Sequence, residues 1–281
     1  MPIKLLALFL CFFTSSLFAG NLDEALLLLK NGEHDKAFHI INEYAKKGDA
    51  EAEYYLGLAY AEGLGVNKNL EEAIRLIKSS AVKEYPKAQF EMGNLFRSGA
   101  FGQVHYLKAI NWYELAANNG LAEAQHVLGH AYSNGVGVPV DYEKALQWYK
   151  KAAQQGYAIS QNNIGWAYQN GFGVNKDYQE AVKWFRVAAE KNQVNALNNL
   201  ANAYDDGNGV EVDHVEAARL WQIAADLGYS SAQNNLGLAY EFGKGVQKNT
   251  NKALELFKLS TEQGDPNGTV NYNRLRKSLG Q

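Results

Sequence analysis

The chain has 281 residues, of which 47% are hydrophobic, 12% aromatic and 20% charged, with a formal net charge of −3. The apolar and aromatic content excludes an intrinsically disordered chain, and the nearly balanced charge argues against a nucleic-acid-binding protein. No run of about 20 apolar residues is present, so we expect no membrane-spanning helix.

Residues 1–19 have the pattern of a secretory signal peptide. Lys4 supplies the positive charge, Leu5–Phe13 form a short apolar run, and Ala19 precedes the expected cleavage point. The alternative is a buried N-terminal helix. The single cysteine, Cys11, lies inside the apolar run, so the mature chain would have no thiol. We expect a periplasmic or secreted protein.

Internal repetition begins after an N-terminal helix pair, expected within residues 20–51 at Leu22–Lys30 and His34–Lys47. Six units of 36 residues follow without an insertion or deletion between them. Their boundaries are 52–87, 88–123, 124–159, 160–195, 196–231 and 232–267. Residues 268–281 are expected to form a polar helix that caps the stack. One repeat cannot bury its own apolar face, so stacking of neighbours must do so.

Each repeat is expected to form two helices. In the third repeat the first helix carries Ala124, Leu128-Gly129 and Tyr132 at helical spacing, and it ends at a Gly-x-Gly-Val turn. A mid-helix glycine costs about 0.5–1 kcal/mol relative to alanine, so its recurrence implies close approach of the second helix. A capping residue then opens that second helix. These caps are Asn69, Asp141, Asp177, Asp213 and Asn249, with His105 as the weakest member.

The second repeat departs from this turn pattern. It reads Gly99-Ala100-Phe101-Gly102-Gln103, with Gly102 at the position where the other repeats have valine. Because the length of the repeat does not change, we expect a distorted turn and no break in the stack.

These units resemble Sel-one-like repeats, which are relatives of the tetratricopeptide repeat. The matching pattern is Ala-x3-Leu-Gly-x-x-Tyr, Gly-x-Gly-Val and Lys-Ala-x-x-Trp-Tyr-x-x-Ala-Ala-x-x-Gly, most complete in residues 124–156. The resemblance implies an all-α, right-handed α-solenoid of an exported bacterial type that binds a protein or peptide along its concave face. A cysteine-rich secreted branch of the family is linked to β-lactam binding, but this chain lacks those cysteines.

In the related repeats the first helices line the concave face, so two columns of residues are expected there by position. The predicted partner-binding residues are Tyr54, Phe90, Asn94, His126, His130, Asn162, Trp166, Asn198, Asn202, Asn234 and Leu238. Asparagine can donate to and accept from the backbone of an extended peptide, and the Trp166 ring could supply a hot spot. The alternative is that asparagine is only a solvated surface choice.

Metal binding and catalysis are not expected. His126 and His130 are four residues apart, a spacing that can bind Zn²⁺, but no third ligand lies near them in sequence. The acidic turn with Asp205, Asp206, Glu211 and Asp213 does not match a calcium loop. No nucleophile elbow, phosphate loop or His-Glu-x-x-His motif occurs, so we expect neither an enzyme nor a cofactor.

Three functions remain open from the sequence. The leading hypothesis is an exported scaffold for protein–protein interaction, with an immunity protein against a periplasm-directed toxin as a sharper version of it. A separate hypothesis is a structural protein of the cell envelope that holds a complex together. The enzymatic alternative is a β-lactam-binding or hydrolysing protein like the cysteine-rich branch, which the missing cysteines disfavour.

Overall fold

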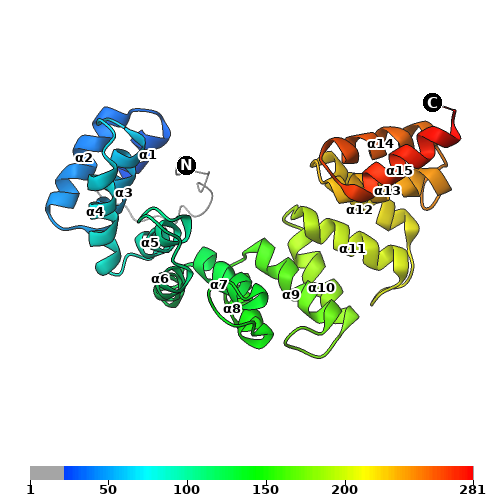
Figure 1. Ribbon diagram of the computed structural model, residues 1–281, viewed down its shortest axis with the longest axis horizontal. Helices are drawn as coiled ribbons and strands as arrows, with labels where there is room; N and C mark the ends of the chain where they lie inside the picture. The colour runs from blue at the N-terminus through cyan, green and yellow to red at the C-terminus, as the bar shows by residue number, and fades with distance from the viewer. Residues whose placement is uncertain (1–21, 281) are drawn as a thin grey trace. The chain divides into compact units, whose positions relative to one another are not determined.

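The computed structural model describes residues 22–280 and contains, within that range, fifteen α-helices and no strand (Figure 1). The expected all-α class is thus confirmed. The predicted signal peptide, residues 1–19, lies outside the described residues. The helices are α1 Leu22–Lys30, α2 His34–Lys46, α3 Ala50–Glu62, α4 Leu70–Val82, α5 Pro86–Ser98, α6 Tyr106–Asn118, α7 Ala122–Asn134, α8 Tyr142–Gln154, α9 Ala158–Asn170, α10 Tyr178–Ala189, α11 Val194–Asp206, α12 His214–Asp226, α13 Ser230–Phe242, α14 Thr250–Glu262 and α15 Pro266–Ser278.

The repeat period sets the helix boundaries. From α3 on, each first helix of a repeat begins 36 residues after the previous one, and so does each second helix from α2 on. Successive helices pack against each other, as α9 does on α10 and α10 on α11. The chain divides into two compact units. Unit 1 runs to Ala131 and takes in Gly135–Pro139, and unit 2 consists of Tyr132–Asn134 and the residues from Val140 onward.

The predicted helix caps are confirmed. Asp177 is extended at the start of α10, and its side chain accepts a hydrogen bond from the backbone N–H of Glu180. The equivalent side chains of Asn69, Asp141, Asp213 and Asn249 accept from backbone N–H groups in the same way. His105 precedes α6 without a side-chain cap, as its residue type implies.

The glycine on the first helix permits close contact with the second helix, as predicted. A Cβ atom added to Gly165 would lie 2.6 Å from ring carbons of Phe185, which is 1% exposed. Gly237 has the same relation to the ring of Phe257. In the fifth repeat Ala201 takes this position and is itself fully buried. Helix packing therefore explains a residue that intrinsic helix propensity disfavours.

The irregular turn of the second repeat keeps the anchors of the regular turns. His105 N–H donates to the carbonyl of Phe96, as Asn69 N–H donates to Tyr60 in the first repeat. Between these anchors Gly102 has φ +97° and its N–H donates to the carbonyl of Gly99. The change is confined to the middle of the turn, so the helices on either side stay in phase.

Buried glutamines join one repeat to the next. Gln161 on α9 donates to the carbonyl of Ala153 near the end of α8, and Gln233 on α13 does the same to Ala225 on α12. Each bond serves a carbonyl near a helix end, where carbonyl groups lack a partner within the helix. These contacts help to hold first helices against the preceding second helices.

Candidate partner-binding surface

In unit 2 the first helices α9, α11 and α13 lie side by side and form one face, which we call the first-helix face. Asparagine side chains link them. The Asn199 amide donates to Oδ1 of Asn162 at 2.9 Å, and the Asn235 amide donates to Oδ1 of Asn198 at 3.1 Å. A third bond of this asparagine ladder joins Asn271 on α15 to Asn234 at 2.8 Å.

Three of the predicted groove residues are buried in this ladder. Asn162, Asn198 and Asn234 are 6%, 7% and 5% exposed, and the Oδ1 atom of each accepts a bond from the next first helix. The expectation that these three side chains are open to a partner therefore needs correction. Because a buried polar group needs a partner, each asparagine requires its neighbour, and the ladder fixes how adjacent first helices align.

The second predicted column has a different local role. Its members are Asn94, His130, Trp166, Asn202 and Leu238. Asn94 accepts from the Tyr113 hydroxyl at 2.9 Å, and Asn202 accepts from the Trp221 indole N–H at 3.1 Å. In repeats whose second-helix ring has no polar tip, the column carries an apolar side chain. Trp166 belongs to the repeat of Phe185, and Leu238 belongs to that of Phe257. Asparagine in this column thus satisfies a buried aromatic N–H or O–H group.

In unit 1 the corresponding face is aromatic. The rings of Tyr54 and Tyr55 meet edge to face with centroids 5.2 Å apart, and Phe90 lies 5.3 Å from the Tyr113 ring. Burial raises the pKa of the Tyr54 hydroxyl above its ordinary value, and the nearby Glu91 carboxyl adds to this rise. Burial likewise raises the pKa of Glu91 itself.

Of the two histidines on α7, His126 is the more enclosed and His130 is exposed. Burial lowers the pKa of His126 to about 4, with a smaller contribution from the charge of His130. His126 is therefore neutral at pH 7. Over the part of the chain that the structure describes, no group of three or more histidine, cysteine or acidic residues is placed to hold a metal ion.

An aromatic cluster lies at the α9 side of the first-helix face. Trp166 is 45% exposed, and its ring centroid is 4.8 Å from that of Phe172 in the following turn. Phe172 stacks in turn on Tyr142, the first residue of α8, at 4.6 Å. We call Trp166, Phe172 and Tyr142 the aromatic cluster. Of all the sequence-predicted residues, Trp166 presents the largest apolar surface.

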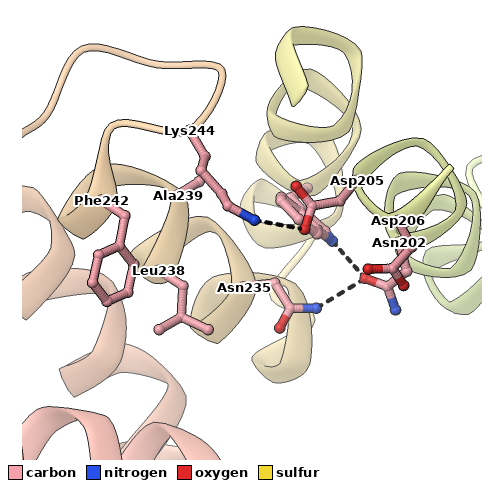
Figure 2. Close-up of a pocket in the computed structure, with 9 residues that line it drawn as sticks. Asn202, Asp205, Asp206, Asn235, Leu238, Ala239, Phe242 and Lys244 are labelled. Atoms are coloured by element: carbon pink, nitrogen blue, oxygen red, sulfur yellow. Dashed lines mark hydrogen bonds and ion pairs between the residues drawn. The ribbon is translucent and has the colours of Figure 1, made fainter. Parts of the chain in front are cut away.

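A pocket of about 360 Å³ lies between α11 and α13 on the same face (Figure 2). It is lined by Asn202, Asp205, Asp206, Trp221, Asn235, Leu238, Ala239, Phe242 and Lys244. Lys244 Nζ lies 3.5 Å from Asp205, and Asn235 donates to Asn202 at 3.2 Å. Phe242, at the end of α13, is 63% exposed.

The sequence-based list contains two of these lining residues, Asn202 and Leu238, and misses the carboxylates, Phe242 and Lys244. The sequence does contain a feature that distinguishes these missed residues. The last two residues of α11 are both aspartate, whereas the same positions of α7 and α9 carry Ser133-Asn134 and Gln169-Asn170. An aromatic residue ends α13 where a polar residue ends the other first helices of the repeats.

The architecture defines an α-solenoid of stacked helix pairs. In agreement with this, the family model described as Sel1 repeat matches residues 50–81, 86–121, 122–157, 158–193, 194–229 and 230–265. Each matched segment begins two residues before the corresponding unit defined from the sequence. The chain belongs to the Sel1 repeat family.

Solved structures agree with this assignment. The chain is 33% identical, with a TM-score of 0.77, to a protective antigen present in uropathogenic Escherichia coli strains that displays an SLR fold. That match covers 89% of this chain but only 56% of the E. coli protein. A Sel1 repeat protein from Oxalobacter formigenes is 29% identical with a TM-score of 0.77, and the match covers 86% of this chain and 97% of that one. A search of curated proteins found no match.

Sel1 repeat solenoids of this kind serve as protein-interaction scaffolds, and they are generally not catalytic. No helix among residues 22–280 is long and apolar enough to cross a membrane.

Proposed function

We propose that this protein is an interaction scaffold that binds a partner protein, through an extended segment, on the first-helix face of unit 2. The observation that carries the proposal is the joint position of two features on that face. The aromatic cluster offers exposed rings, and the α11–α13 pocket offers a cavity on the neighbouring first helices. Partly exposed aromatic anchors beside a cavity are typical of residues that dominate the binding energy.

The rigidity of this face supports the proposal. The ladder bonds hold α9, α11, α13 and α15 in fixed register, so the cluster and the pocket need little ordering when a partner arrives. The polar atoms of the ladder are already satisfied. A partner would therefore gain its affinity mainly from Trp166, Phe172 and the residues that line the pocket.

Peptide display on the purified full chain tests this function. Peptides selected from a random library are expected to lose about tenfold or more in affinity on Trp166→Ala and on Phe242→Ala, because each substitution removes an exposed aromatic anchor. Val187→Ala is the matched control, since Val187 is 39% exposed on the second helix α10. Unchanged affinity of both aromatic variants, or an equal loss with the control, would contradict the proposal.

We further propose that the scaffold acts after export. Two findings support this: the signal-like pattern of residues 1–19 and the description of the E. coli relative as a protective antigen. The full-length gene expressed in a Gram-negative host is expected to yield a periplasmic or secreted chain that begins at Gly20. N-terminal sequencing of the fractionated protein provides the measurement, and a cytoplasmic chain that retains Met1 would reject export.

A further inference from the structure

A small side chain lines the α11–α13 pocket at the position where the preceding repeat has a tryptophan. In the fourth repeat Trp166 and Phe172 contact each other at 4.8 Å. One repeat later Asn202, which lines the pocket, takes the position of Trp166. The side chain of Asn202 is also held in place by two hydrogen bonds, because its Oδ1 accepts from both Trp221 and Asn235. The space that a large ring fills in the fourth repeat is therefore left open beside α13.

The charge of this pocket is negative. Its lining contains two carboxylates, Asp205 and Asp206, and one ammonium group, Lys244. Asp205 is already satisfied, since His214 Nδ1 lies 2.7 Å and Lys244 Nζ 3.5 Å from its oxygens. Asp206 is exposed and forms an ion pair with none of the described cationic groups. One uncompensated carboxylate therefore remains to attract a positive charge.

Two more acidic residues follow α11 in the chain. Glu211 and Asp213 are exposed in the turn after α11, and Asp213 serves as the cap of α12. The lysine or arginine nearest to them in sequence, Arg219, is paired with Glu216 at 2.7 Å. The Asp206 carboxylate, which lies beside the apolar wall of the pocket, raises the local concentration of cations.

The wall of the pocket is apolar and suits a cation on a long stem. Leu238, Ala239 and the exposed ring of Phe242 form the α13 side in Figure 2. Lysine and arginine bury their methylene stems on apolar surface while the charged head reaches a polar partner. The ring of Phe242 also offers a face to which a cation is attracted. A small inorganic cation would leave this apolar wall unused.

We propose that the α11–α13 pocket binds a lysine or arginine side chain of the partner segment, with Asp206 facing the charge and Leu238 and Phe242 flanking the stem. This inference rests on the proposed function, because it names the chemistry of the segment that lies on the first-helix face. Binding of a free lysine analogue to the pocket can be measured without any partner, so this inference can be tested separately from the proposed function.

The pocket itself is tested with N-acetyl-lysine amide as the probe. Trp221 lines the pocket, so its indole N–H resonance in a ¹⁵N NMR spectrum of the full chain reports on occupancy. Millimolar probe is expected to shift this resonance and to leave the indole signals of Trp148 and Trp184 in place. The neutral analogue N-acetyl-norleucine amide is expected to cause no shift. Equal shifts from both probes, or none from either, would overturn the proposal.

Two variants assign the effect to charge at Asp206. Asp206→Asn is expected to weaken binding of the lysine probe about threefold, the loss of one solvent-exposed ion pair. Glu255→Gln removes the same charge from an exposed position on the second helix α14. This control variant is expected to leave the affinity for the lysine probe unchanged. Since Asp206 is exposed at the end of α11, its substitution leaves the fold intact. An equal effect of the two variants would overturn a specific role for Asp206.

Display-selected peptides distinguish failure of this inference from failure of the proposed function. Peptides selected on the full chain are expected to be enriched in lysine or arginine at one position, and Asp206→Lys is expected to remove that enrichment. Peptides that bind without any basic residue would overturn the inference and leave the scaffold function standing. Failure to select any peptide would contradict the scaffold function, while the probe experiment would still decide the chemistry of the pocket.

Discussion

Asn198→Asp is expected to lower the free energy of unfolding by about 3 kcal/mol, because the substitution buries an uncompensated charge. Asn198 is 7% exposed, and its Oδ1 accepts from the Asn235 amide. Aspartate has nearly the same shape and keeps the acceptor, so the loss isolates the charge and the missing amide group. Urea unfolding followed by circular dichroism measures the effect.

The matched control for this substitution is Asn251→Asp, since Asn251 is exposed near the start of α14. A negative charge in the first turn of a helix is favourable, so this variant is expected to be neutral or slightly stabilised. Acid should partly restore Asn198→Asp, because a buried carboxyl group is neutralised as pH falls. Equal stability of the two variants at pH 7 would show that the ladder does not fix the helices.

Gly209→Ala is expected to lower the free energy of unfolding by about 3 kcal/mol, of which backbone strain accounts for about 1 kcal/mol. Gly209 has φ +79°, a conformation that disfavours alanine. An added Cβ atom would also overlap the carbonyl group of Tyr178 and lie 2.8 Å from the backbone nitrogen of Gln179. Backbone atoms at the start of α10 cannot move aside as a flexible side chain would.

Gly228→Ala is the control that separates the cost of backbone strain from the cost of atomic overlap at the added Cβ atom. Gly228 has φ +84°, but an added Cβ atom would meet nothing within 4 Å. The free energy of unfolding of this variant is expected to fall by about 1 kcal/mol, the contribution of backbone strain alone. The difference between the two midpoints of urea unfolding reports the close packing of the α11–α12 turn on α10. Equal losses would contradict that packing.

The fold was predictable because the 36-residue period is strict. A constant period places the small residues, turn glycines and caps at the same point of nearly every repeat, so the copies together support one interpretation. Asp177 illustrates this, since its position before an apolar run predicts the cap that it forms. The glycine of the first helix was also interpretable, because only close packing on a ring such as that of Phe185 justifies it.

The binding surface was less predictable, because its details depend on contacts between repeats. The columns of residues lie on the first helices as expected, but the burial of Asn162, Asn198 and Asn234 was not foreseen. Asn199 lies 37 residues after Asn162, and nothing in a single repeat shows that they bond. The pocket was missed for a related reason. It depends on Asn202 being smaller than Trp166, which matters only when the volumes of successive repeats are compared.

Photo-crosslinking tests the central claim that the partner lies on the first-helix face of unit 2. A photoreactive phenylalanine analogue is incorporated at Phe242 in one chain and at Val187 in another, and each chain is irradiated with a display-selected peptide. We predict a covalent peptide adduct at position 242 and none at position 187, because Phe242 lies at the pocket and Val187 lies on α10. An adduct at 187 without one at 242 would contradict the account.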